Sequence, residues 1–122
     1  MDLYRDELLD HYKNPHNFGE IVDPKISIEE YNPLCGDRIC IQVKSDKGQV
    51  TEAGFTGEGC AISMAAASML TDYIKGRSLQ ELKELDGTKV LEILNLSDIS
   101  PARLKCALLS FEALKKVLVQ VT

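Results

Sequence analysis

The feature that most constrains the fold is a run of alternating residues in the first half of the chain. Ile39, Ile41 and Val43 alternate with less apolar partners, a period of two that is typical of a strand with one buried face. Residues 45–48 carry a turn signal, and residues 49–56 read as the return strand. Ile26 and Ile28 begin a similar alternation upstream. Three strands in such close succession predict an antiparallel meander.

Helical patterns flank this block on both sides. Residues 3–13 predict a short amphipathic helix that ends at Asn14, because a residue before proline disfavours the helical conformation. Residues 14–25 read as a loop. Residues 60–75 are apolar nearly all round, which predicts a buried helix stopped by Gly76. Short helices are expected over residues 78–85 and 87–95, and Ser100-Pro101 should open the final helix.

Length and charge exclude several classes of protein. A chain of 122 residues with 44% apolar and 27% charged residues is expected to form one globular domain, residues 1–122. A net charge of −5 without a basic cluster argues against nucleic acid and anionic membranes as partners. We find neither an apolar signal region nor an apolar run of about 20 residues, and therefore expect a soluble, cytoplasmic protein.

Three cysteine motifs lie in three separate stretches: Cys35-Gly36-Asp37, Gly59-Cys60 and Lys105-Cys106. In a reducing cytosol, cysteines are more often metal ligands, reactive thiols or core residues than disulfides. Three thiolates and one carboxylate form a four-ligand set for zinc, or for iron held with sulfide. Function follows from this site if the fold gathers the motifs; otherwise the chain is an ordinary small domain with buried cysteines.

Each motif also has a plainer interpretation. Cys35 and Asp37 point the same way in an extended chain, but could be a turn cysteine and a solvated aspartate. Cys60 begins a helix, where free N–H groups favour a thiolate, yet buried cysteines are common in such helices. Cys106 lies off the main apolar stripe of the final helix, and a lesser stripe on its side would allow it simply to pack.

The remaining cysteine and the histidines carry weaker signals. Cys40 is out of phase with Ile39 and Ile41 and has neither a glycine nor a helix start beside it, so we predict that it is not a ligand. His11 and His16 have no ligand spacing to another candidate, and packing or solvent exposure is expected for His11. The acidic residues of the helices, Glu7 and Asp86 among them, look like solvated faces.

The combination of motifs resembles a known family, the U-type iron–sulfur cluster assembly scaffolds (IscU, SufU and the N-terminal domain of NifU). The resemblance runs through Tyr4, Asp10-His11-Tyr12-Lys13-Asn14-Pro15, Asn17, Gly19, Cys35-Gly36-Asp37, Gly59-Cys60 and Lys105-Cys106. It implies an α+β fold with a three-stranded antiparallel β-sheet and four to five helices packed on one face. It also implies Cys35, Asp37, Cys60 and Cys106 as the ligand set.

The resemblance further implies a function. A cysteine desulfurase would supply persulfide sulfur to a thiolate of this chain, for which Cys106 and Cys60 are the candidates. Lys105 would support the thiolate of Cys106 by its charge. Iron and sulfide would then form a transient cluster, [2Fe–2S] in type, that passes to apo-protein acceptors or carriers. Asp37 would be the weak, exchangeable ligand. Such a protein is a scaffold or carrier, and whether it also counts as a sulfur-transfer enzyme is left open.

Features of two branches are mixed. Lys105 stands where IscU proteins have histidine and resembles SufU, but the run from Gly76 to Pro101 is too short for the insertion of around twenty residues usual in SufU. The Leu-Pro-Pro-Val-Lys stretch that the dedicated chaperone of the IscU system reads is absent, which argues against that partner. Two alternatives stay open: a zinc-containing sulfurtransferase partner of the desulfurase, and a structural zinc domain used for protein contacts.

Overall fold

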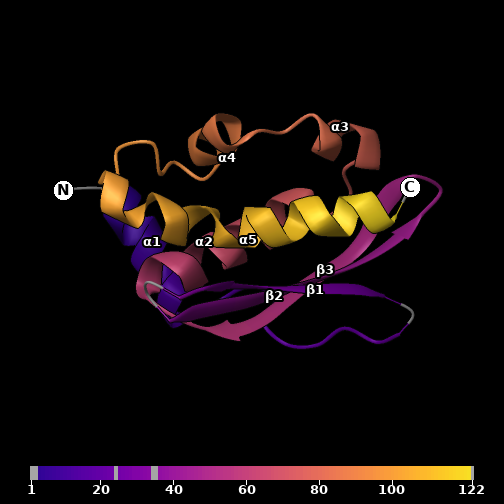
Figure 1. Cartoon of the computed structure of the whole chain (residues 1–122), viewed down its shortest axis with the longest axis horizontal. Helices are drawn as coiled ribbons and strands as arrows, with labels where there is room; N and C mark the ends of the chain where they lie inside the picture. Colours follow the sequence, from indigo (N-terminus) through magenta and orange to yellow (C-terminus); the bar gives the residue numbers. More distant parts are fainter. Residues whose placement is uncertain (1–2, 24, 34–35, 122) are drawn as a thin grey trace.

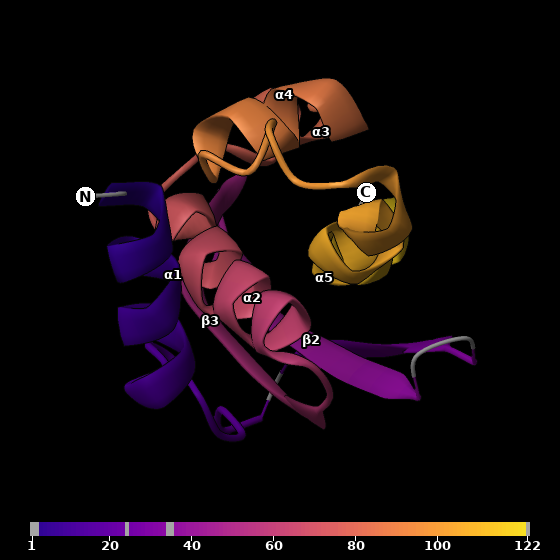
Figure 2. The same cartoon turned by 90° about the vertical axis from the view of Figure 1, so that its left-hand side faces the viewer.

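A computed structural model describes residues 3–23, 25–33 and 36–121, with side chains from residue 6 onward. Over these residues the chain forms a three-stranded sheet and five helices. The strands are β1 (Ile26–Asn32), β2 (Asp37–Asp46) and β3 (Gln49–Glu58), and the helices are α1 (Leu3–Lys13), α2 (Ala61–Ile74), α3 (Leu79–Lys83), α4 (Gly87–Ile93) and α5 (Pro101–Gln120). The helices lie on one side of the sheet, with α3 and α4 above α2 and α5 (Figures 1 and 2). The predicted α+β architecture is confirmed.

The sheet is the predicted meander, in the order β1-β2-β3 with antiparallel neighbours. Ile41, in the central strand, pairs with Ile28 on one side and Phe55 on the other. Lys47 and Gly48 connect β2 to β3 with φ angles of 52° and 79°. Two successive left-handed residues are the signature of a type I′ hairpin turn, whose twist matches that of the strands it joins.

The core lies between the sheet and the helices. Ile39, Ile41 and Val43 of β2 are buried beneath α2 and α5. Helix α5 packs against β1, β2 and α2 as well as against α3 and α4, so the lesser stripe on the side of Cys106 (Leu109, Ala113, Val117) is buried. Cys106 belongs to that lesser stripe and is 1% exposed. This burial places the Cys106 side chain inside the molecule and not on a solvent-facing side of α5.

Gln42 departs from the simple alternation of β2. Its side chain points to the face opposite Ile41, yet it is only 1% exposed. The loop after α1 covers it: the backbone N–H of Ile21 donates to Gln42 Oε1 at 2.8 Å. Ile21 also lies over Gly54, where an added Cβ would come within 3.0 Å of Ile21 Cγ2. The loop therefore seals part of the outer face of the sheet, a long-range contact that the strand period does not encode.

The helix ends follow their local signals. Helix α1 ends at Lys13, as the proline at 15 predicts, and Gly76 follows α2 with φ 80°. The Ser78 side chain accepts from the Glu81 N–H at the start of α3. Asp86 is exposed, as expected, and also caps α4 by accepting from the Lys89 N–H at 2.8 Å. No helix among the described residues has the length and hydropathy that a bilayer crossing requires.

Candidate metal centre

Asp37 joins the start of β2 to the start of α2. Its side chain is fully buried. Oδ1 accepts the backbone N–H of Cys60 at 2.9 Å, and Oδ2 accepts the hydroxyl of Ser63 at 2.7 Å. Cys60 is the N-cap residue of α2, with φ −71° and ψ 167°. The carboxylate of Asp37 thus takes the place of a capping side chain, and the positive end of the α2 dipole favours its negative charge.

Cys60 lies at the start of α2, as the sequence predicts, and its own backbone N–H is bonded to Asp37. The Cys60 sulfur lies 3.4 Å from the Ser63 hydroxyl and 3.9 Å from Asp37 Oδ2. Thiol, hydroxyl and carboxylate therefore form one polar cluster at the end of the helix, and Cys60 is only partly buried.

Cys106 completes this cluster from the first turns of α5. The starts of β2 and α5 lie at the same end of the molecule (Figure 1). One ligand atom each from Asp37, Cys60 and Cys106 lies within 4.8 Å of the other two. Ligand atoms around a zinc ion with bonds of about 2.0–2.3 Å are roughly 3.3–3.8 Å apart, so small side-chain rotations would suffice to enclose an ion. Two sulfur ligands and one carboxylate suit zinc or iron.

The fourth predicted ligand, Cys35, lies outside the described residues. Its neighbour Gly36 is described, with φ 71° and its N–H bonded to the carbonyl of Asn32 at 2.8 Å. Asn32 at the end of β1 pairs with Asp37 at the start of β2. Cys35 stays a predicted ligand, because it lies two residues before Asp37 in the sequence.

Two glycines allow the close approach of strand and helix. A Cβ on Gly59 would lie 2.5 Å from Asp37 Oδ1, so a side chain there would push the carboxylate away from Cys60. A Cβ on Gly57, which has φ 146°, would lie 2.0 Å from the carbonyl oxygen of Arg38. The Gly57-Glu58-Gly59 motif is therefore explained by steric contact with β2 and its first residue.

Ser63 was missed as a site residue by the sequence reasoning. Its side chain is 1% exposed and donates to Asp37 Oδ2. The available signal was its position: three residues after Cys60, on the first turn of α2, a hydroxyl faces the same end of the helix as the cysteine. Ser63 orients the carboxylate and occupies the oxygen that lies nearer to the Cys60 sulfur.

The other sequence candidates lie apart from this cluster or at its margin. Cys40 lies on β2 with its sulfur 3.0 Å from the Ser27 hydroxyl, on the strand face opposite Ile41, and does not belong to the group around Asp37. Lys105 is exposed. His11 and His16, for which no ligand spacing was found, come together with Asp72 as a second group of potential ligands.

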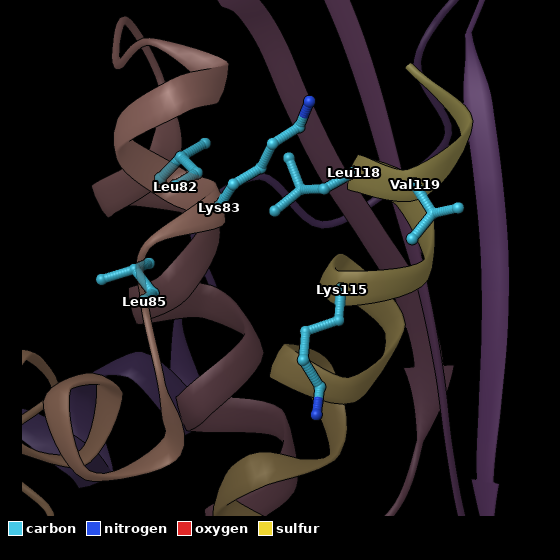
Figure 3. Close-up of a pocket in the computed structure, with 6 residues that line it drawn as sticks. All are labelled: Leu82, Lys83, Leu85, Lys115, Leu118 and Val119. Carbon is cyan, nitrogen blue, oxygen red and sulfur yellow. The ribbon is translucent and has the colours of Figure 1, made fainter. Parts of the chain in front are cut away.

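Two surface hollows flank α5. One, of about 490 Å³, lies between the end of β1 and α5 and is lined by Tyr31, Pro33, Leu104 and Lys105 among others. The other, of about 350 Å³, lies between α3 and the C-terminal half of α5 (Figure 3). It is lined by Leu82, Lys83, Leu85, Lys115, Leu118 and Val119. None of these six side chains is a thiol, imidazole or carboxylate, so the second hollow offers no metal-binding chemistry.

The chain is similar to several known proteins. The family described as the NifU-like N-terminal domain matches residues 3–121. The chain belongs to this family. The zinc-dependent sulfurtransferase SufU of Bacillus subtilis (strain 168) is 42% identical over 130 residues, covering 93% of this chain and 88% of the relative. The iron–sulfur cluster assembly scaffold protein IscU of Azotobacter vinelandii is 34% identical over 116 residues, covering 92% and 88%.

A solved structure shows the same fold. The N-terminal part of a nitrogen-fixing NifU-like protein from Brucella abortus superposes with a TM-score of 0.80 over 98% of this chain and 94% of that chain, at 19% identity.

The sequence comparisons also bear on the difference between the SufU and IscU branches. The match to SufU spans 130 residues, whereas 93% of this 122-residue chain is about 113, a difference of about 17. That difference agrees with the absence here of the insertion usual in SufU.

Proposed function

We propose that this chain is a scaffold on which an iron–sulfur cluster is assembled from iron and from sulfur supplied by a cysteine desulfurase. The observation that carries the proposal is the convergence of Asp37, Cys60 and Cys106, whose potential ligand atoms lie within 4.8 Å of one another. Iron and sulfide are cargo in this function, held for transfer to apo-protein acceptors or carriers. We propose Cys35 as the fourth ligand from its place in the Cys35-Gly36-Asp37 motif, and the cytoplasm as the site of action.

Sulfur delivery requires one accessible thiolate. That thiolate attacks the outer sulfur of the desulfurase persulfide, the S–S bond breaks, and the desulfurase cysteine leaves as a thiolate. Cys60 is partly buried whereas Cys106 is 1% exposed, so Cys60 is the accessible candidate in this conformation. Cys106 must become more exposed if it is to accept sulfur. The exposed Lys105 directly precedes Cys106 on α5, where its charge would favour a thiolate.

The chemistry of Asp37 suits temporary storage. A carboxylate is a harder ligand than a thiolate and binds iron in a sulfur-rich site more weakly. Asp37 also has partners of its own in the absence of metal, the Cys60 N–H and the Ser63 hydroxyl. When a cluster leaves, these hydrogen bonds satisfy the buried carboxylate, which lowers the cost of release.

A zinc-dependent sulfurtransferase is the second candidate function. The 42% identity to SufU and the lysine at position 105 favour it, and the shorter chain argues against it. The same donor set fits zinc, which would hold the thiolates ready and release one to receive sulfur. In this case the protein activates the desulfurase and passes sulfur onward without building a cluster.

Anaerobic incubation with a cysteine desulfurase, cysteine and ferrous iron distinguishes the scaffold function from the sulfurtransferase function. A scaffold develops a visible iron–sulfur chromophore that is lost when apo-ferredoxin is added and converted to holo-ferredoxin. A sulfurtransferase instead retains stoichiometric zinc, accelerates the desulfurase and shows a persulfide by mass spectrometry without a transferable chromophore. A Cys40→Ala variant, which removes a thiol outside the cluster, should behave as the wild type does in this assay.

A further inference from the structure

Three potential ligands meet on the α1 side of α2, away from the cysteine cluster. His11 belongs to α1, His16 to the loop that follows it, and Asp72 to the last turn of α2. One ligand atom from each lies within 4.8 Å of the other two. Two imidazoles and a carboxylate are a common donor set for zinc and ferrous ions in proteins.

Hydrogen bonds fix the orientation of His11. Its ring is 9% exposed, and Nδ1 lies 2.7 Å from the hydroxyl of Ser68 on α2. Ser68 Oγ also accepts the backbone N–H of His16 at 2.7 Å. An oxygen with two lone pairs can accept from both His16 N–H and His11 Nδ1–H, which leaves the lone pair of His11 Nε2 available. Metal-binding histidines are held in this way, with the other ring nitrogen donating to a neighbouring oxygen.

His16 and Asp72 are the more exposed pair. Their side chains are 48% and 42% exposed, and His16 Nδ1 lies 2.5 Å from Asp72 Oδ2. Asn17 Nδ2 donates a hydrogen bond to the other carboxylate oxygen, Asp72 Oδ1, at 2.9 Å. Burial raises the pKa of Asp72, but the hydrogen bonds from His16 and Asn17 and the charges of His16 and His11 outweigh it and lower the pKa.

Space for an ion and a further ligand lies beside this group. A hollow of about 250 Å³ is lined by His11, Asp72 and Glu7 together with apolar residues of α2 and α4. Glu7 precedes His11 by four residues on α1, so the two side chains share one face of the helix. An ion bound by the two histidines and Asp72 would thus keep an open coordination position. The Glu7 carboxylate lies in the same hollow.

We propose that His11, His16 and Asp72 form a second binding site, for a divalent transition metal of the zinc and ferrous class. It is separate from the cysteine cluster: Asp72 follows Cys60 by 12 residues of α2, about 18 Å along the helix axis at about 1.5 Å per residue. Binding would lengthen the distance between His16 Nδ1 and Asp72 Oδ2 from 2.5 Å to about 3.3 Å, which is the separation of ligand atoms around a tetrahedral ion. The partial exposure of both side chains permits this movement.

The chain offers a clean test, because its sequence contains two histidines and both belong to the proposed site. Full-length protein is first loaded with one equivalent of Zn²⁺, which the thiolates take, and is then titrated with further Zn²⁺. Imidazole ¹⁵N signals are followed by NMR, and bound zinc is measured after dialysis. We expect a saturable second equivalent that shifts both histidine rings.

Three variants and one control make the result decisive. His16→Gln and Asp72→Asn each weaken the second equivalent by about 10-fold or more, while Ser68→Ala, which removes the orienting hydroxyl, weakens it by about 10-fold. Glu84→Gln removes an equal charge elsewhere and leaves both equivalents unchanged. Circular dichroism confirms that each variant is folded. The proposal is overturned if the rings do not shift at millimolar Zn²⁺, or if Asp72→Asn binds the second equivalent as wild type does. The first equivalent is scored separately, so failure here leaves the proposed function untouched.

Discussion

Oδ1 of Asp37 lies 2.9 Å from the backbone nitrogen of Cys60, so one predicted ligand anchors the segment that carries another. The carboxylate caps the start of α2, and in the proposed function it would also bind metal. Metal binding would compete with the hydrogen bond from Ser63. This competition supplies a physical reason for a site that holds its cargo for a limited time.

Replacing Asp37 by alanine should separate these two uses. The bound iron–sulfur cluster becomes longer lived, because the weak oxygen ligand and the hydrogen bonds that favour its release are both removed; a single zinc ion, by contrast, loses one of its four ligands. Stability of the metal-free protein falls by about 1–2 kcal/mol through loss of the cap. Cluster lifetime is followed by absorbance during chelator challenge, and stability by urea unfolding. Faster loss of cluster in Asp37→Ala than in wild type would contradict the role assigned to the carboxylate.

Gly59→Ala should weaken metal binding without touching a ligand. The added Cβ lies 2.5 Å from Asp37 Oδ1 and displaces the carboxylate. We expect about a 10-fold loss of zinc affinity, as for the loss of a residue that orients a ligand. Gly87→Ala is the matched control, because its Cβ would meet Leu108 Cδ1 at 3.5 Å, an ordinary contact. Competition with a chromophoric chelator measures both, and equal affinities for the two variants would argue against this steric explanation.

Metal removal should leave the fold intact. The apolar core between the sheet and the helices does not involve the site, and the Asp37 carboxylate keeps its two hydrogen bonds without metal. Far-UV circular dichroism of chelator-treated protein should therefore match that of the loaded form. Loss of helix signal on chelation, with no effect on desulfurase turnover, would favour the structural zinc domain instead.

Gln42→Leu tests the seal formed by the loop after α1. The substitution leaves the partly buried N–H of Ile21 without its acceptor, which costs about 1 kcal/mol. Gln49→Leu, at an exposed position of β3, serves as control and should change the free energy of unfolding by less than about 0.5 kcal/mol. Urea unfolding of the two variants measures the difference, and equal stabilities would show that the loop contact contributes nothing.

Local signals were sufficient for most of the fold. The alternation at Ile39, Ile41 and Val43 and the turn at Lys47 and Gly48 are properties of neighbouring residues, and the structure has them as predicted. The same holds for the helix ends at Ser78 and Gly76. Grouping of the cysteine motifs came from their resemblance to a family, because no local period relates positions 37, 60 and 106.

Contacts between distant segments explain what the sequence reasoning missed. Ser63 and Gln42 acquire their partners only when another element folds over them. His16 and Asp72 are 56 residues apart, and a spacing rule within one helix or strand cannot pair them. The burial of Cys106 likewise depends on α5 being enclosed on several sides.

X-ray absorption at the zinc edge of protein loaded with one equivalent of Zn²⁺ tests convergence of the site most directly. We predict about three sulfur neighbours at about 2.3 Å and one oxygen at about 2.0–2.2 Å, with the oxygen contribution lost in Asp37→Ala. A first shell of nitrogen and oxygen alone, or one unchanged by Cys60→Ser, would show that the thiolates do not meet at one ion and would contradict the account.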